Sequence, residues 1–263
     1  MEGRSRRPSS GRAIAPQELD ELVHISVTEV GVLCDVAGHH ALSEELALTL
    51  LKRRDLPKEV LEALAKNGRV MKRREVKTEI VKHQRTPRHI SLPLIKHLYT
   101  GDLMHAALTP SVPADLKMAI EEALIKRLPS VSVGERLMFS KRASGRVAAF
   151  LLNDEEARIV DAALNNPYMT EALIIKQLVL EQPSQLLTVH VSHHPKWSLR
   201  KDIRMAMLKN PYTPFAFAIV CAEGLTLKEL KDLLFVSQLP EQIKEYLVAT
   251  TERKEEKKRA RGS

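Results

Sequence analysis

The stretch Asn166-Pro167-Tyr168-Met169-Thr170-Glu171-Ala172-Leu173 has a second copy in the chain, Asn210-Pro211-Tyr212-Thr213-Pro214-Phe215-Ala216-Phe217. Each copy follows one apolar stretch and precedes another, and the apolar residues recur at the spacing of a helix. Proline has no backbone N–H and holds φ near the helical value, so it fits the first turn of a helix and not its interior. The Asn-Pro pair therefore ends one helix, and the Thr or Pro three residues after that pair begins the next.

Weaker copies of this turn occur at Thr109-Pro110-Ser111-Val112-Pro113, His83-Gln84-Arg85-Thr86-Pro87 and His194-Pro195-Lys196-Trp197-Ser198. The residues that begin the next helix then form a series along the chain: Pro57, Pro87, Pro113, Gly145, Thr170, Ser198, Pro214 and Pro240. Their irregular spacing, mostly 25 to 32 residues, is typical of one helical unit per repeat. The sequence predicts a degenerate helical repeat array.

Periodicity and start and stop signals predict about twelve to fourteen short helices. The clearest cover residues 43–54, 57–66, 87–98, 113–127, 154–164, 170–180, 198–209, 214–222, 226–235 and 240–251. Helices this short are marginal alone in water, so each must bury its apolar face on its neighbours. Stacking in chain order achieves this, and the predicted fold is an all-α α-solenoid.

Four segments are expected in chain order. Residues 1–15 form a disordered basic tail, 16–42 a helical N-terminal cap, 43–251 the solenoid and 252–263 a charged tail. We expect both basic termini to be flexible.

The Asn-Pro-Tyr-x-Thr/Pro turns make residues 43–250 similar to the HEAT-like and leucine-rich-repeat-variant α-solenoids of bacteria. Two further stretches resemble a bacterial HEAT-like family, Arg142-Ala143-Ser144-Gly145-Arg146-Val147-Ala148 and His194-Pro195-Lys196-Trp197-Ser198-Leu199-Arg200. The resemblance implies an architecture more than an activity. Leucine-rich-repeat-variant proteins can carry an N-terminal iron–sulfur cysteine cluster, but only Cys34 lies in that region here.

Composition excludes several classes of protein. A chain of 263 residues with 44% hydrophobic side chains is not wholly disordered. With 4% aromatic residues and no sustained strand alternation, the chain is not an all-β protein. Two cysteines cannot form a disulfide framework, and both stand in apolar sequence typical of inert buried thiols. The sequence contains neither a signal peptide nor an apolar run of about 20 residues, so we predict a cytoplasmic protein without a membrane partner.

The net charge of +8 is concentrated in the two termini and in residues 69–89, which hold eight Lys and Arg against two Glu. Such a segment can neutralise nucleic-acid phosphates, and some HEAT-like proteins bind DNA. The alternative is a solvated helix face and loop with local pairs among Glu75, Lys77 and Glu79. The nearest aromatic residue is Tyr99, which disfavours base stacking.

A second candidate is the stretch Lys196 to Arg204, where Trp197 and Asp202 stand among cations. In a HEAT-like glycosylase such a group could recognise damaged DNA. The alternative places Trp197 at a repeat junction and Arg200 and Arg204 in solvent.

The histidines His190, His193 and His194, and the pair His39-His40, lack the four ligands of a structural zinc site, so we expect neither metal nor cofactor. Phosphate-binding, nucleophile-elbow and zinc-protease motifs are absent from the sequence. This favours a non-catalytic role and leaves an enzymatic one open.

The sequence thus predicts a scaffold or adaptor, a right-handed solenoid that binds a protein partner. Nucleic-acid binding, including action on damaged DNA, is the alternative. The candidate binding residues are Arg73, Arg74, Lys82, Arg85, Arg88, Lys96, Trp197, Arg200 and Arg204.

Overall fold

The structure is a computed structural model that describes residues 15–16, 18–24, 29–180, 182, 184–235 and 241–261. Throughout these residues the regular structure is helical, with no strand. The helices are α1 (Glu18–His24), α2 (Val30–Gly38), α3 (Glu44–Leu51), α4 (Lys58–Lys66), α5 (Arg74–Lys82), α6 (Arg88–Ile95), α7 (Thr100–Leu108), α8 (Ala114–Arg127), α9 (Val133–Arg142), α10 (Gly145–Phe150), α11 (Ala157–Leu164), α12 (Glu171–Leu178), α13 (Gln185–His193), α14 (Lys201–Lys209), α15 (Phe215–Glu223), α16 (Leu227–Leu234) and α17 (Glu241–Arg261). Three short 3₁₀ helices, η1 (Val70–Lys72), η2 (Leu128–Ser130) and η3 (Leu151–Asn153), join them.

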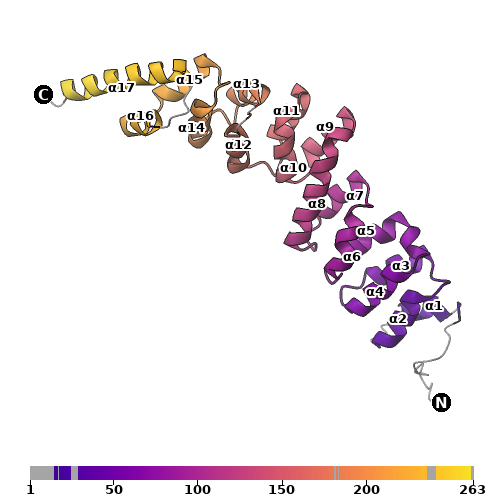
Figure 1. Ribbon diagram of the computed structural model, residues 1–263. Coiled ribbons are helices and arrows are strands. Elements are labelled where there is room, and N and C mark those ends of the chain that lie inside the picture. The colour runs from indigo at the N-terminus through magenta and orange to yellow at the C-terminus, as the bar shows by residue number, and fades with distance from the viewer. Residues whose placement is uncertain are drawn as a thin grey trace. The chain divides into compact units, whose positions relative to one another are not determined.

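The chain divides into two compact units, Met1–Arg127 and Leu128–Ser263. In the first unit α1, α3, α5 and α7 pack in sequence as one layer, while α2 packs on α4 and α6 packs on α8. In the second, α9, α11 and α13 form one series of contacts and α10, α12 and α14 another. Figure 1 shows how consecutive helices follow one another within each unit. Many of these helices pack on the next but one in the chain, which confirms the predicted all-α repeat fold.

Each of the ten clearest predicted helices is present, but the described residues hold seventeen α-helices, more than expected. Among the additional ones, α5, α7 and α9 begin after Arg73, Tyr99 and Ser132, where no proline marks the start. The predicted cap, residues 16–42, supplies α1 and α2, which pack on α3 and α4. Apart from Ala15, the predicted N-terminal tail lies outside the described residues.

At the C-terminus α17 continues to Arg261, where we expected a charged tail from residue 252. Neither Gly nor Pro interrupts the sequence before Gly262, and Glu255 stands four residues before Arg259, which favours a helix. Glu255 also pairs with Lys231 of α16, and Lys254 donates to the carbonyl of Leu225 at 2.5 Å. These contacts attach this part of α17 to its neighbour.

The prolines of the turns occupy the N-cap, one position before the first turn of the helix in which the sequence places them. Pro57, Pro87 and Pro214 are the N-cap residues of α4, α6 and α15, with extended backbone and φ of −62°, −59° and −56°. Thr170 caps α12 through its side chain, which accepts a hydrogen bond from the N–H of Leu173. The repeated turn therefore starts the next helix, as its sequence predicts.

The residue that begins each turn also joins consecutive repeats. The amide of Asn210 donates to the carbonyl of Leu178 at 2.8 Å and accepts the N–H of Tyr212 at 2.9 Å. Asn166 does the same with the carbonyl of Ser140 and the N–H of Tyr168. We call these side chains connector residues. They are Asn67, His83, Asn166, His194 and Asn210.

The connector residues satisfy polar groups that short helices leave unpaired at their ends. Asn210 is 1% exposed and Asn166 4% exposed, so water cannot replace these hydrogen bonds without opening the packing.

The turn at Asn166 also requires a glycine in the neighbouring repeat. Gly145 is the first residue of α10. A Cβ atom on it would fall well inside van der Waals contact of the Tyr168 carbonyl and 3.0 Å from the Leu173 side chain. The backbones of α10 and of this turn therefore approach each other at a distance that only glycine permits.

We predict that Asn210→Ala lowers the free energy of unfolding by about 1–3 kcal/mol, because it leaves the buried Leu178 carbonyl and the partly buried Tyr212 N–H without this partner. Urea unfolding measures the change. Asn153→Ala is the control, because Asn153 is exposed and its amide donates to the side chain of the half-buried Gln177. Equal effects of the two substitutions would contradict the role of the connector residues.

Gly145→Ala is expected to destabilise the protein by about 1–3 kcal/mol through overpacking. Gly134→Ala is the matched control, since only Ser132 Oγ lies within 4.0 Å of its added methyl group. Thermal unfolding of the two variants should show a lower midpoint for the first and an unchanged or higher one for the second. A tolerated alanine at position 145 would show that the close approach is not required.

Candidate functional site

The basic segment 69–89 forms η1, α5, the turn to α6 and the start of α6, and most of its cations have partners within the chain. Arg74 makes two bonds to the Asp102 carboxylate of α7, at 2.7 and 2.9 Å, and lies 4.7 Å from the Tyr99 ring centroid. Arg88 bonds Asp115 of α8 in the same way, at 2.6 and 3.0 Å. Both pairs join α5 or α6 to the next helix of the same layer.

Three other candidate cations of this segment are also engaged. Arg73 lies 3.5 Å from Glu44 of α3, and Lys82 lies 2.8 Å from Glu79 on its own helix. Arg85 donates to the carbonyl of Asp55 at 2.7 Å. Most of the positive charge expected for a ligand is therefore balanced inside the protein.

The side-chain hydrogen bond with Asp102 raises the pKa of Arg74, and the bond from Arg88 lowers the pKa of the Asp115 carboxyl. Each shift favours the charged form of the group concerned. The two pairs are exposed to solvent, so they orient side chains more than they stabilise the fold.

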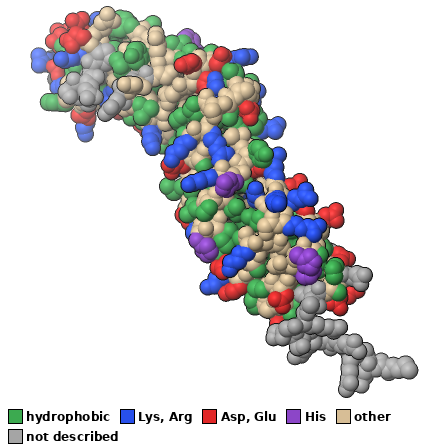
Figure 2. All heavy atoms as spheres, turned by 45° about the vertical axis from the view of Figure 1, so that its right-hand side comes forward, with side chains coloured by type: hydrophobic (Ala, Val, Ile, Leu, Met, Phe, Trp, Pro, Cys, Tyr) green, Lys and Arg blue, Asp and Glu red, His purple; other side chains and the backbone are tan. Residues whose placement is uncertain are grey.

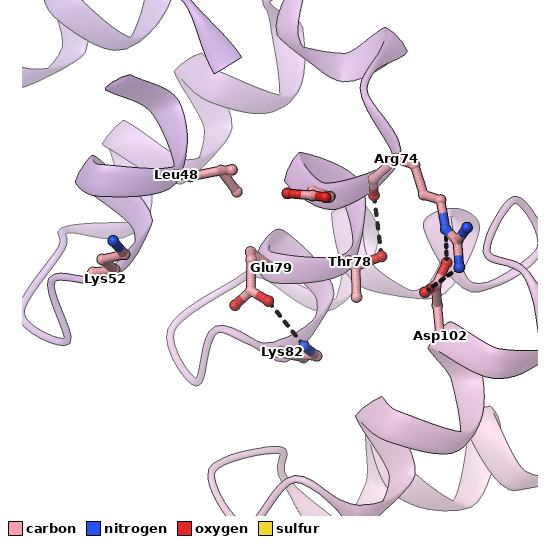
Figure 3. Close-up of a pocket in the computed structure, with 8 residues that line it drawn as sticks. Leu48, Lys52, Arg74, Thr78, Glu79, Lys82 and Asp102 are labelled. Atoms are coloured by element: carbon pink, nitrogen blue, oxygen red, sulfur yellow. Dashed lines mark hydrogen bonds and ion pairs between the residues drawn. The ribbon is translucent and has the colours of Figure 1, made fainter. Parts of the chain in front are cut away.

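A hollow of about 680 Å³ crosses α3, α5 and α7. Leu48 and Lys52 line it from α3, and Asp102 lines it from α7. The remaining lining residues come from one face of α5: Arg74, Glu75, Thr78, Glu79 and Lys82. Figure 3 shows the α3 side chains opposite those of α5, with the Arg74–Asp102 and Glu79–Lys82 pairs along the lining.

A second hollow of about 610 Å³ shares Lys52, Glu79 and Lys82 with the first and extends over the turns that follow α5 and α7. Together the two hollows form one surface, which we call the α3–α5–α7 groove. The first of them is lined by three cations and three carboxylates around Leu48. On the face that Figure 2 shows, Lys and Arg likewise lie among acidic and apolar side chains.

Two of the predicted binding residues, Arg74 and Lys82, line the groove. Arg88 and Lys96 belong to α6 and its C-terminal end, outside the layer that forms it. Sequence reasoning missed Lys52 and the three carboxylates. The four-residue spacing of Arg74, Thr78 and Lys82 indicates one helix face, but nothing in the sequence places Asp102 opposite it.

Trp197, predicted as a surface residue for binding, is buried at 3% exposure. Its indole N–H donates to the carbonyl of Leu164 at 2.8 Å, and Lys196 covers the ring at 3.9 Å from its centroid. Trp197 therefore packs at a repeat junction, the alternative that the sequence left open. Arg200 is exposed, whereas the Arg204 Nε donates to the Ser198 carbonyl at 2.7 Å.

The histidines and cysteines have structural surroundings. His190 Nδ1 lies 2.5 Å from Asp161 Oδ1, and His194 Nε2 lies 3.3 Å from Asn165 Oδ1, both across to α11. Burial raises the pKa of Cys221 to about 11 and also raises that of the half-buried Cys34, so neither thiol is activated.

Within the described part of the chain, no three His, Cys, Asp or Glu side chains converge on a point where a metal ion would bind. A helix that crosses a membrane must be long and apolar, and the described part of the chain contains no such helix.

Comparison of the chain with protein-family models, with curated proteins and with solved structures gave no significant match. The resemblance to HEAT-like repeats therefore stays a prediction from the turn sequences.

Trp197→Phe is predicted to lower the free energy of unfolding by about 1–3 kcal/mol, because the ring still fills its site but the Leu164 carbonyl loses its donor. Chemical denaturation measures this loss. Leu199→Ala, at a side chain 69% exposed in the same turn, should have little effect. Unchanged stability of the Phe variant would contradict the structural role of the indole N–H.

Proposed function

We propose that this protein is a non-catalytic binding module of the HEAT-like type, in which the α3–α5–α7 groove holds a segment of a partner protein. The observation that carries the proposal is the charge of the groove. In the first hollow of the groove, three carboxylates, Glu75, Glu79 and Asp102, stand among three cations. A protein segment with side chains of both signs can pair with such a lining, whereas the phosphates of a nucleic acid would be repelled by the carboxylates.

The dimensions of the groove also suit a peptide. Its two hollows, about 680 and 610 Å³, each fall in the usual range for ligand sites. They share Lys52, Glu79 and Lys82, so an extended segment can pass from one hollow to the other. Leu48 supplies an apolar contact in the first hollow.

Lys52 follows α3 and, of the three cations that line the first hollow, is the one without a carboxylate partner among the described residues. A carboxylate of the ligand is therefore expected to meet Lys52. Arg74 and Lys82 already have acidic partners within the chain, so they contribute orientation more than net attraction.

The nucleic-acid alternative requires free cations in segment 69–89. Four of these cations are each paired with a carboxylate, namely Arg73, Arg74, Lys82 and Arg88. This pairing argues against nucleic-acid binding by the segment. The nucleic-acid alternative predicts an affinity that falls steeply with added salt.

A random peptide display library selected on the full chain tests the proposal. Selected peptides are expected to carry acidic residues and to bind Lys52→Glu at least tenfold more weakly, because the new carboxylate repels them. Lys96→Glu is the matched control, with the same charge change on an exposed side chain outside the groove. It should bind as the wild type does.

Peptides that bind both variants equally would place the site elsewhere. Failure to select peptides, together with salt-sensitive binding of a DNA or RNA duplex that Lys52→Glu weakens, would replace the proposal with the nucleic-acid alternative.

A further inference from the structure

The second hollow of the α3–α5–α7 groove differs from the first in its charge. The Lys, Arg, Asp and Glu residues of its lining are Lys52, Arg54, Lys82 and Glu79. The Glu79 carboxylate lies 2.8 Å from Lys82 and compensates it, and Figure 3 shows this bonded pair on α5 with Lys52 on the α3 side. Two positive charges therefore remain in the second hollow, whereas three carboxylates match three cations in the first.

The two remaining cations are Lys52, which follows α3, and Arg54, in the turn between α3 and α4. Both residues are exposed, and within the described part of the chain neither side chain has a hydrogen bond or an ion pair with another residue. The carboxylate of Asp55, which follows in sequence, is bonded by Arg53 and does not line the hollow. Lys52 and Arg54 are therefore available to a ligand.

Neutral donors stand beside these cations in the lining. Gln84, in the turn after α5, is exposed, and its amide has no hydrogen-bond partner among the described residues. The turn after α7 adds the exposed Ser111, whose Oγ lies 3.5 Å from the Lys82 carbonyl, at the long limit of a hydrogen bond. An amide nitrogen and a hydroxyl both donate to the oxygens of an anion. Two cations and two neutral donors thus line one hollow.

A phosphate monoester matches this lining better than a carboxylate does. It carries a charge of about −1.5 to −2 at neutral pH and has three strong acceptor oxygens, whereas a carboxylate carries a single charge. Arginine binds phosphate through two parallel N–H donors, and lysine binds it as a point charge. One phosphate can therefore compensate both Lys52 and Arg54 and still accept hydrogen bonds from Gln84 and Ser111.

The first hollow indicates what carries the phosphate. In a nucleic acid, further phosphates would follow along the groove, where Glu75 and Asp102 would repel them. A protein segment can carry one phosphate and place neutral or basic side chains beside it. A phosphorylated serine or threonine within a segment of mixed charge therefore suits both hollows.

We infer that the ligand of the α3–α5–α7 groove is a protein segment phosphorylated on serine or threonine, whose phosphate binds to Lys52 and Arg54 in the second hollow. The inference rests on the proposed function, since it names the chemistry of the segment held in that groove. An acidic residue is then a weaker substitute for the phosphate, with one negative charge in place of about two. Arg54, Gln84 and Ser111 join Lys52 as the residues that recognise the anionic group.

A synthetic peptide library with one fixed phosphoserine between random residues, screened on the full chain, tests the inference. Fluorescence polarisation then compares each selected peptide with its unphosphorylated twin. We expect the phosphate to strengthen binding by about tenfold or more, and Arg54→Gln to reduce this ratio by about threefold or more, because one of the two cations is lost. Arg142→Gln is the matched control, at an exposed arginine of the second unit, and should keep the wild-type ratio.

Amide chemical shifts of the wild-type protein provide a readout that needs no variant. The phosphopeptide should shift the N–H signals of Gln84 and Ser111 more than its unphosphorylated twin does. The signal of Gly134, in the second unit, should not move. Inorganic phosphate alone, at the concentration of the phosphopeptide, should not displace the peptide.

Equal binding of the peptides with and without phosphate would overturn the inference and leave the proposed function standing, provided that Lys52→Glu weakens both. A phosphate preference that survives Arg54→Gln, or displacement by inorganic phosphate, would also overturn it, because the phosphate would then bind elsewhere or without its segment. If no peptide binds, phosphorylated or not, the proposed function fails and the inference fails with it. A DNA duplex that binds more tightly than every phosphopeptide would replace both with the nucleic-acid alternative.

Discussion

The fold depends on hydrogen bonds between the end of one short helix and the turn of the next repeat. Helices of eight or nine residues leave a large share of their backbone polar groups unpaired at their ends. The connector residues form hydrogen bonds across 23 to 32 residues of sequence, so that each turn both starts a helix and joins it to the neighbouring repeat. Apolar packing brings the helices together, and these bonds fix which ends meet.

The same layering positions the groove. Because α3, α5 and α7 pack side by side, one face of α5 lies between residues of its two neighbours, and charges that are distant in sequence become partners. Arg74 with Asp102 and Arg88 with Asp115 are examples. In a segment that is strongly basic as a sequence, four cations, Arg73, Arg74, Lys82 and Arg88, are therefore paired with carboxylates.

Much of the fold follows from local sequence. The positions of α4, α6, α12 and α15 follow from Pro57, Pro87, Thr170 and Pro214, since backbone restrictions act within a few residues. Helices that begin without such residues, such as α5 and α7, were not predicted. The site was harder to predict, because Asp102 meets Arg74 and Trp197 meets Leu164 only through the packing of neighbouring repeats.

Amide hydrogen exchange at the turns tests the central claim most directly. The N–H groups of Arg69, Arg85, Tyr168 and Tyr212 lie outside regular helices and would exchange rapidly unless the connector side chains hold them. We expect these amides to be protected to an extent comparable with the adjoining helices. Exchange at the rate of exposed loops, with the helices still protected, would contradict the account.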